Sequence, residues 1–443
     1  MPSAATVKTT GAAAAPAGDV PDFHTALRYW LLLGFISFGG PTGQIAIMHR
    51  DLVERRHWIT EARFLHALNY CVLLPGPEAQ QLAIYVGWLL HGVPGGAVAG
   101  VLFVLPSAVL LLGLSWAYVA WGDVPLVAGL FTGLRPAVVA VVAVAIVRIG
   151  RRALRTPLAL ALAAAAFVAR LVDIAFPLIV ASAIVLGLLV GRVRPRLLAA
   201  VGHGPAGGAD SEAPPRDAAV GRSTRTAVVV CLLLWLAPFV LLPAWPEAPP
   251  ILRDEAVFFS TTALVTFGGA YAVLDYIRDA AVAAGWLAPG QMMDGLGLAE
   301  TTPGPLIMVT QFVGFVAAWR HPGALTPPLA AVAGALVTTW VTFVPCFLWI
   351  FAGAPYIERL RARPWLDAAL GALTAVIVGV LTNLALAFAA GAFFPAGASL
   401  DAGAVAVTLL AVVALQRWGW PMPAVILASA ALGALRHLAA GLH

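Results

Sequence analysis

The chain has 443 residues, of which 61% are hydrophobic and only 11% are charged, and its mean hydropathy is +0.91. Soluble domains carry about 25% charged residues because their surface faces water, so this composition excludes an ordinary soluble protein and predicts one embedded in lipid. Arginine supplies all but one of the basic residues behind the net charge of +5, and the single lysine, Lys8, excludes a P-loop ATPase, whose loop needs a lysine on the phosphates.

The N-terminal segment, residues 1–22, is rich in alanine, proline and threonine and has no apolar core of the signal-peptide kind. It predicts a disordered cytoplasmic tail that is not cleaved. The cysteines lie far apart in apolar runs and form no CxxC pair, so they predict neither a metal site nor a disulfide framework. They are Cys71, Cys231 and Cys346.

Runs of about 20 apolar residues, the length that crosses a bilayer as a helix, follow in two groups separated by a polar linker at 194–225. The first group is 26–48, 66–91, 94–121, 126–149, 156–172 and 174–191. The second group is 226–244, 256–276, 296–318, 328–353, 366–391, 402–416 and 420–438. The sequence therefore predicts an all-α polytopic membrane protein of about 13 transmembrane helices.

Arginine placement predicts which connections face the cytoplasm, because cytoplasmic loops carry an excess of basic residues. With a cytoplasmic N-terminus, the inner connections hold Arg148, Arg151, Arg152, Arg155, Arg192, Arg194, Arg196, Arg359, Arg361 and Arg363. The outer connections at 245–255 and 391–401 hold one arginine among four acidic residues. The connection at 50–63 is an exception, with four arginines partly offset by three acids. We expect the N-terminus inside and the C-terminus outside.

The second half of the chain repeats motifs of the first. Phe38-Gly39-Gly40 recurs as Phe267-Gly268-Gly269, and Pro75-Gly76-Pro77 recurs as Pro303-Gly304-Pro305. The interval from the phenylalanine to the first proline is 37 residues in the first half and 36 in the second. Such matched order and spacing indicates an internal duplication.

The predicted helices between the two copies determine how the copies are oriented. Seven crossings separate equivalent points, and an odd number reverses the direction of the chain through the membrane. We therefore expect two transporter repeats, 23–193 and 250–443, with inverted topology, and the single helix at 226–245 produces the inversion. Inverted repeats of this kind place a transport site at their interface.

The repeated motifs put Gly and Pro inside apolar runs, where Pro breaks a helix. The last proline of each Pro-Gly-Pro suits the first position of a new half-helix, whose free N–H groups and positive dipole end bind oxyanions. Ordinary helix kinks are the alternative, but matched triplets in both halves favour one central oxyanion site. The breaks predict the site residues Gly39, Gly40, Pro75, Gly76, Pro77, Gly268, Gly269, Pro303, Gly304 and Pro305.

Arg135 is the strongest single candidate for a residue that binds the substrate, because it lies ten residues into the 126–149 run, near the middle of the bilayer. An arginine there is costly, so it should face the bundle interior and meet a partner. Its guanidinium suits a tetrahedral oxyanion, and this predicts a direct ligand of the substrate. The alternatives are a structural pair with Glu78 or a backbone carbonyl, or snorkelling to the interface.

Polar residues beside the breaks complete the predicted site. Gln81 and Thr302 could donate hydrogen bonds to the anion. Glu78 follows the first Pro-Gly-Pro, where it either complements the helix dipole or couples transport to protons, and Glu300 precedes the second. Between the first two runs, the Asp51–Leu68 stretch, with Thr60 as N-cap, predicts an interfacial helix.

Three stretches of the first half resemble the chromate ion transporter family. They are Phe38-Gly39-Gly40-Pro41, Leu74-Pro75-Gly76-Pro77-Glu78-Ala79-Gln80-Gln81 and Gly133-Leu134-Arg135-Pro136-Ala137-Val138, and residues 266–269 and 302–306 of the second half agree. The resemblance covers about 25–380, and it departs where Ala270 stands in place of Pro41. It implies a bidomain protein of the bacterial inner membrane, with a periplasmic C-terminus, that exports chromate and confers chromate resistance. Antiparallel halves and thirteen spans are implied in the same way, with sulfate as the related oxyanion.

The sequence thus predicts a secondary transporter that works by alternating access and is not an enzyme. Its expected partners are a small oxyanion and membrane lipid, with no cofactor, metal or nucleic acid, and a homodimer stays open. One rival is a transporter or channel for another oxyanion such as sulfate. A second rival is a membrane transferase using Asp275 and Asp279 on a metal–diphosphate, which the isolated motif with Arg278 between the acids disfavours.

Overall fold

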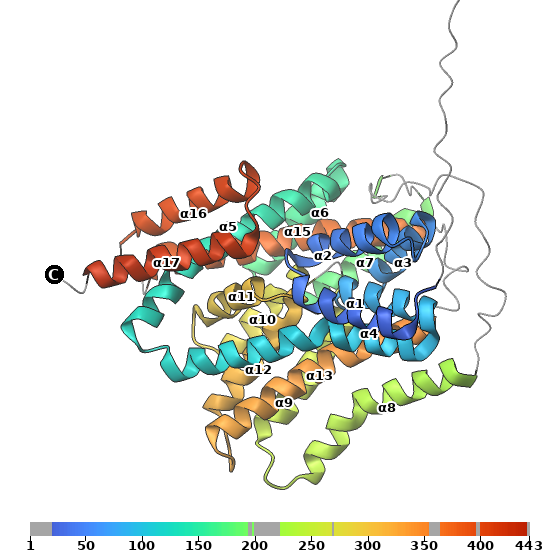
Figure 1. The fold of residues 1–443 in the computed structure, drawn as a ribbon. Coiled ribbons are helices and arrows are strands. Elements are labelled where there is room, and N and C mark those ends of the chain that lie inside the picture. The colour runs from blue at the N-terminus through green and yellow to red at the C-terminus, as the bar shows by residue number, and fades with distance from the viewer. Residues whose placement is uncertain are drawn as a thin grey trace, which may run out of the picture.

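A computed structural model describes residues 20–193, 197–198, 222–267, 270–353, 364–395 and 399–440. These residues form a bundle of helices with no β-strand among them (Figure 1). All but the last three residues of the predicted tail, and most of the predicted linker, lie outside this described part of the chain.

The helices follow the predicted runs closely. In the first half they are α1 (Phe23–Ile36), α2 (Gly40–His49), the π-helix η1 (Arg50–Arg55), α3 (Glu61–Leu73), α4 (Glu78–Trp121), α5 (Pro125–Ala153), α6 (Pro157–Leu171) and α7 (Phe176–Val193). Then come α8 (Arg222–Ala244), α9 (Pro250–Val265), α10 (Tyr271–Ala283), α11 (Gln291–Thr301) and the 3-10 helix η3 (Leu306–Met308). The last are α12 (Val309–Arg320), α13 (Pro327–Gly353), α15 (Pro364–Phe393), α16 (Ala402–Gln416) and α17 (Met422–Ala440).

Seven of the described helices are long and apolar enough to cross a membrane, namely α4, α5, α7, α8, α13, α15 and α17. Three shorter apolar segments, 157–171, 306–320 and 402–416, accompany them. These helices confirm an all-α polytopic membrane protein.

Four predicted runs are broken where Gly and Pro interrupt them. The run 26–48 divides into α1 and α2, and 66–91 into α3 and the start of α4; the runs 256–276 and 296–318 divide in the same way. The element labelled α4, Glu78–Trp121, is two helices across a kink, because the backbone is not helical at His91 and Gly92, where the predicted runs 66–91 and 94–121 meet. The positive φ of Gly92, 63°, allows the chain to turn there without a new loop.

The predicted interfacial helix over Asp51–Leu68 is wrong as a single element. The π-helix ends at Arg55, and His57 then takes a left-handed conformation with φ 53°, which no helix can continue through. A separate helix, α3, begins at Glu61. Its predicted N-cap is confirmed, because the Thr60 side chain accepts a hydrogen bond from the N–H of Arg63 at 3.4 Å.

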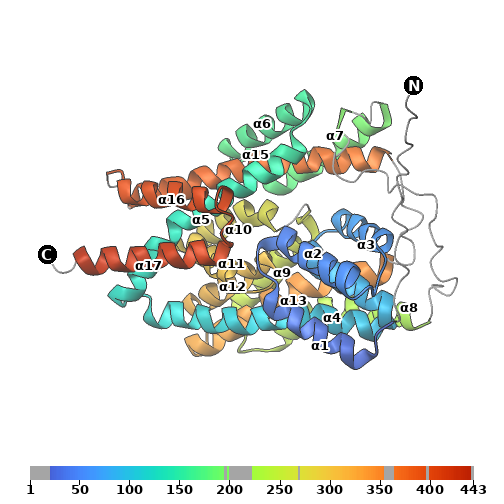
Figure 2. The ribbon, with the colours of Figure 1, turned by 45° about the horizontal axis from the view of Figure 1, so that its top comes forward.

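The two halves exchange helices. The long helix α15 of the second half packs against α6 and α7, whereas α5 of the first half packs against α16 and α17 (Figures 1 and 2). Small residues allow close approach at both contacts: a Cβ on Gly133 would lie 2.6 Å from the Cα of Gly433, and one on Gly187 would lie 2.5 Å from the Cα of Ala369. Helices α5 and α15 also touch one another. Each half therefore packs largely against helices that the other half supplies.

Helix α8 packs along α13 and lies at one edge of the bundle in Figure 1. Most of its apolar side chains are exposed, including Leu233, Val240 and Leu241. An exposed apolar face of this length fits contact with lipid.

Candidate functional site

The two Pro-Gly-Pro breaks are held by hydrogen bonds that cross between the halves. The N–H of Gly76, in the first break, donates to the carbonyl of Thr266 at 2.7 Å. The N–H of Gly304, in the second break, donates to the carbonyl of Ser37 at 2.8 Å. Ser37 and Thr266 each directly precede a Phe-Gly-Gly motif. Each Pro-Gly-Pro is thus fixed by the segment that leads into the other half's Phe-Gly-Gly, and protein groups satisfy this broken backbone.

Both breaks require glycine at their centre. Gly76 has φ +117° and Gly304 has φ +109°, a region that is strained for any residue with a side chain. A Cβ on Gly304 would lie 2.6 Å from the Cβ of Ser107 in α4, and one on Gly76 would lie 3.0 Å from the Sγ of Cys346 in α13. These contacts also cross between the halves. They hold the two breaks against the two long helices.

A narrow crevice lies between the first Phe-Gly-Gly and the second Pro-Gly-Pro. It is lined by Gly39, Gly40, Ala299, Glu300, Thr302, Gly304 and Leu306, four of which are predicted site residues. Gly39 and Gly40 both have positive φ, 92° and 65°, and they lead into α2 from the first half, whereas the other lining residues belong to the second half. In this conformation the crevice is too narrow to hold an oxyanion.

Glu300 is the charged side chain that lines this crevice among the described residues. It lies near the end of α11, is 4% exposed, and accepts a hydrogen bond from the hydroxyl of Tyr271 at the start of α10. Tyr271 did not figure in the predicted site. The sequence signal was present, because Tyr271 follows the second Phe-Gly-Gly segment where that half departs from the first.

Amide side chains of the first half donate hydrogen bonds to backbone carbonyls of both breaks. Gln81 donates from Nε2 to the carbonyl of Pro75 at 2.7 Å, between the two ends of the break. Gln44, in α2, donates to the carbonyl of Gly304 at 2.5 Å and so braces the opposite break. Gln80 is 1% exposed, and both of its side-chain polar atoms are buried without a partner among the described residues. Glu78, partly buried, begins α4 beside them.

Arg135 lies in α5 and makes a two-pronged ion pair with Asp294 of α11. Its Nε and Nη2 donate to the two carboxylate oxygens at 2.8 and 2.9 Å, and the Tyr118 hydroxyl also donates to Asp294, at 3.0 Å. The partner is thus Asp294 and not Glu78. Asp294 is 1% exposed, whereas the Arg135 side chain is 31% exposed, so the arginine is the more accessible member of the pair.

The ion pair is separate from the crevice. Asp294 precedes Glu300 by six residues in the same helix, which places the pair about 9 Å further along α11. Arg135 therefore does not line the crevice in this conformation. Sequence reasoning missed Asp294, although the need of an intramembrane arginine for a carboxylate was a signal for it.

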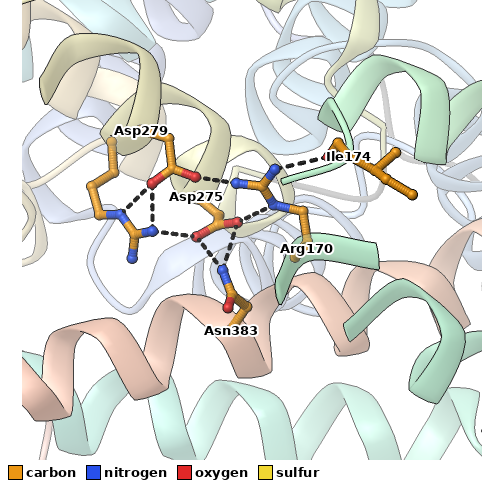
Figure 3. Close-up of polar contacts among 6 residues, drawn as sticks. Arg170, Ile174, Asp275, Asp279 and Asn383 are labelled. Atoms are coloured by element: carbon orange, nitrogen blue, oxygen red, sulfur yellow. Dashed lines mark hydrogen bonds and ion pairs between the residues drawn. The ribbon is translucent and has the colours of Figure 1, made fainter. Parts of the chain in front are cut away.

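A second charged cluster lies where α6, α10 and α15 meet (Figure 3). Arg170, 7% exposed at the end of α6, donates from Nε to Asp275 at 2.7 Å and also pairs with Asp279. Arg278 pairs with both acids, and Asn383 of α15 donates to Asp275 at 3.3 Å. A cavity of about 520 Å³ borders this cluster. The two acids proposed for a metal–diphosphate site are therefore engaged with arginines.

The two remaining predicted site residues, Gly268 and Gly269, lie outside the described residues. Pro303 and Pro305 flank Gly304, which is attached to Ser37, and Pro75 and Pro77 flank Gly76, which is attached to Thr266, so the structure joins each Pro-Gly-Pro to the opposite half. It does not bring Arg135 into contact with them.

Comparison with known proteins shows that the chain is similar to one family. The model of the chromate transporter family matches two stretches of the chain, residues 25–188 and 254–434. The second match extends past residue 380, where the resemblance was expected to fade. A chromate transport protein of Pseudomonas aeruginosa is 30% identical over 388 residues, covering 86% of this chain and 83% of its own length. A chromate transport protein of Cupriavidus metallidurans is 28% identical over 387 residues, covering 86% of each chain. No solved structure matches.

Proposed function

This chain belongs to the chromate transporter family, and we propose that it is a secondary transporter that exports chromate and thereby confers chromate resistance. The observation that carries this proposal is the reciprocal attachment of the two Pro-Gly-Pro breaks, Gly76 to Thr266 and Gly304 to Ser37. It attaches an interrupted helix of each half to the other half inside a membrane bundle, and transporters built from inverted repeats hold their substrate where the repeats meet.

The two halves, 23–193 and 250–443, are on this proposal inverted repeats, separated by the linker 194–225 and the helix 226–245. One family model matching twice supports the duplication. The exchanged packing of α15 with α6 and α7, and of α5 with α16 and α17, supports a two-fold relation between them. About thirteen crossings, with the N-terminus cytoplasmic and the C-terminus periplasmic in a bacterial inner membrane, complete the arrangement.

The anion binds at the crevice between the first Phe-Gly-Gly and the second Pro-Gly-Pro. Gly39 and Gly40 line it at the start of α2, so the first backbone N–H groups of α2 and the dipole of that helix supply positive potential without a bare cation. The side-chain amide of Gln80 has a donor group without a partner nearby, and Thr302 lines the crevice. Glu78 and Gln81 shape the first break, and Arg135 adds positive charge from one side of α11. Because the crevice is closed in this conformation, opening it requires one half to rock against the other.

The membrane potential is sufficient to drive export. A dianion that leaves a cell with a negative interior gains about 4.6 kcal/mol per 100 mV. This equals a gradient of more than about a thousandfold, at about 1.4 kcal/mol for each factor of ten. Both relatives described above are named for chromate, which favours chromate over another oxyanion such as sulfate.

Everted inner-membrane vesicles test this function. Vesicles that carry the chain, energised so that their interior is positive, should accumulate radiolabelled chromate well above empty vesicles, with saturation at high chromate. An equal concentration of sulfate should compete weakly. Accumulation no greater than in empty vesicles would refute the export proposal, and flux that never saturates would indicate a channel instead.

A further inference from the structure

The central crevice contains a carboxyl group, which is an unexpected neighbour for an anion. Glu300 lines the crevice together with Gly39, Gly40 and Thr302, and it is 4% exposed. An ionised carboxylate in a poorly solvated crevice repels an entering anion, and a dianion doubles that repulsion. The crevice can accept chromate as a dianion far more readily when Glu300 carries a proton.

The groups around Glu300 offset only part of this repulsion. From α10, the Tyr271 hydroxyl donates to one carboxylate oxygen. From α5, Arg148 is close enough to act on both Tyr271 and Glu300 through its charge, but it forms no direct ion pair with Glu300 among the described contacts. A phenol is a neutral donor, and it leaves the negative charge of the carboxylate in place.

Among the described residues, one carboxyl group lines the crevice, and the first half has no equivalent of it. The spacing that relates the Pro-Gly-Pro motifs places Val72 at the position of Glu300 in the first half. Glu78 lies beside the other break and does not line the crevice.

We propose that Glu300 binds one proton for each chromate dianion and carries it across the membrane in the same direction. This inference rests on the proposed function, because it assigns the coupling ion of the same site. One proton and one dianion move a single net negative charge in each cycle, where uncoupled transport moves two.

The ratio of charge to substrate is measured in proteoliposomes of the purified full-length protein. The voltage that stops net chromate flux is determined at a tenfold chromate gradient and equal pH on both sides. If one net charge moves with each chromate, as proposed for the wild type, net flux should stop at about 59 mV. If two charges move, it should stop at about 30 mV. Glu300→Gln should shift the balance from about 59 to about 30 mV, because the amide cannot release a proton, and its flux should persist at alkaline pH where the wild-type flux falls.

The alternative is that the proton travels on the substrate, as hydrogen chromate. Glu300→Gln distinguishes a proton carried by Glu300 from one carried by the substrate. A variant that still balances near 59 mV would show that the substrate carries the proton, and a wild type that balances near 30 mV would show that no proton moves; either result overturns the proposal. The exposed Glu247, changed to Gln, is the matched control and should balance as the wild type does.

A second variant keeps the test valid if Glu300→Gln does not fold. Tyr271→Phe retains the carboxyl and should still balance near 59 mV, but its flux should persist to higher pH, since the phenol no longer favours the ionised carboxylate. An unchanged flux profile in Tyr271→Phe would contradict the role of this pair. Absence of chromate flux in liposomes with the wild-type protein would instead refute the proposed function. This result differs from every outcome that concerns the coupling ion alone.

Discussion

Arg135→Ala is expected to destabilise the protein by about 3–5 kcal/mol, because it leaves the carboxylate of Asp294 buried without its ion-pair partner. Asp294→Ala should cost less, because the Arg135 side chain that it leaves without a partner is 31% exposed. Replacing both residues by leucine removes the two charges together, and such apolar replacements are often neutral or stabilising. The double variant should therefore regain most of the wild-type unfolding temperature in detergent.

Transport by the double-leucine variant distinguishes the two roles considered for Arg135. If the exposed part of its guanidinium adds charge to the anion path, transport should stay at least tenfold below wild type although stability returns. Full recovery of transport with stability would show that Arg135 serves only to hold α5 against α11. The measurement is chromate flux in proteoliposomes, normalised to the folded protein.

Gly304→Ala is expected to be among the most damaging single-methyl changes in the described part of the chain. The added Cβ is strained at φ +109°, at about 1–2 kcal/mol, and it would lie 2.6 Å from the Cβ of Ser107, where overpacking typically costs about 1–3 kcal/mol more. Gly76→Ala carries the same backbone strain but meets side-chain ends at 3.0 Å that can shift, so it should cost less. Thermal unfolding in detergent measures both.

A matched glycine and a suppressor make this prediction specific. Gly113 lies in α4 with nothing within 4 Å of an added Cβ, so Gly113→Ala should leave stability unchanged or slightly raised. Ser107→Gly removes the atom that Gly304→Ala would strike, and the double variant should recover the packing part of the loss. If Gly304→Ala and Gly113→Ala unfold at the same temperature, the close contact across the halves is not as described.

The sequence predicted the helices well because apolar runs and Gly and Pro act locally. The ends of α5, α6, α7 and α13 fall within four residues of the predicted runs, and the breaks occur at the predicted motifs. Backbone conformation explains this success, since the proline ring and a glycine with positive φ act on their own positions.

The contacts that attach each Pro-Gly-Pro to the opposite half could not be predicted in the same way. Gly76 and Thr266 are far apart in the sequence, and the hydrogen bond between them depends on how the halves pack. The same holds for Arg135, whose partner was sought near the Pro-Gly-Pro motif and lies instead in α11. A mid-membrane arginine predicts that a partner exists, but several acids satisfy that requirement until the helices are assembled.

The Asp51–Leu68 stretch shows a different limit of prediction from the sequence. Helix propensity over Asp51–Leu68 is adequate, yet the chain takes a left-handed turn at His57 and divides into η1 and α3. Histidine is enriched at positive φ relative to most other residues that carry a side chain, but such conformations are uncommon, so His57 alone is a weak signal for this turn. Tertiary packing decides the conformation of this connection.

The central claim is that chromate occupies the crevice between the first Phe-Gly-Gly and the second Pro-Gly-Pro, and chromium itself can locate it. X-ray diffraction from crystals grown with chromate, recorded at the chromium absorption edge, gives an anomalous difference map in which the anion appears directly. We predict one dominant peak between Gly39–Gly40 and Thr302–Gly304, within hydrogen-bonding distance of the first N–H groups of α2 or of Thr302. A dominant peak against Arg135 or in the cavity beside Arg170 and Arg278, with none in the crevice, would contradict the account.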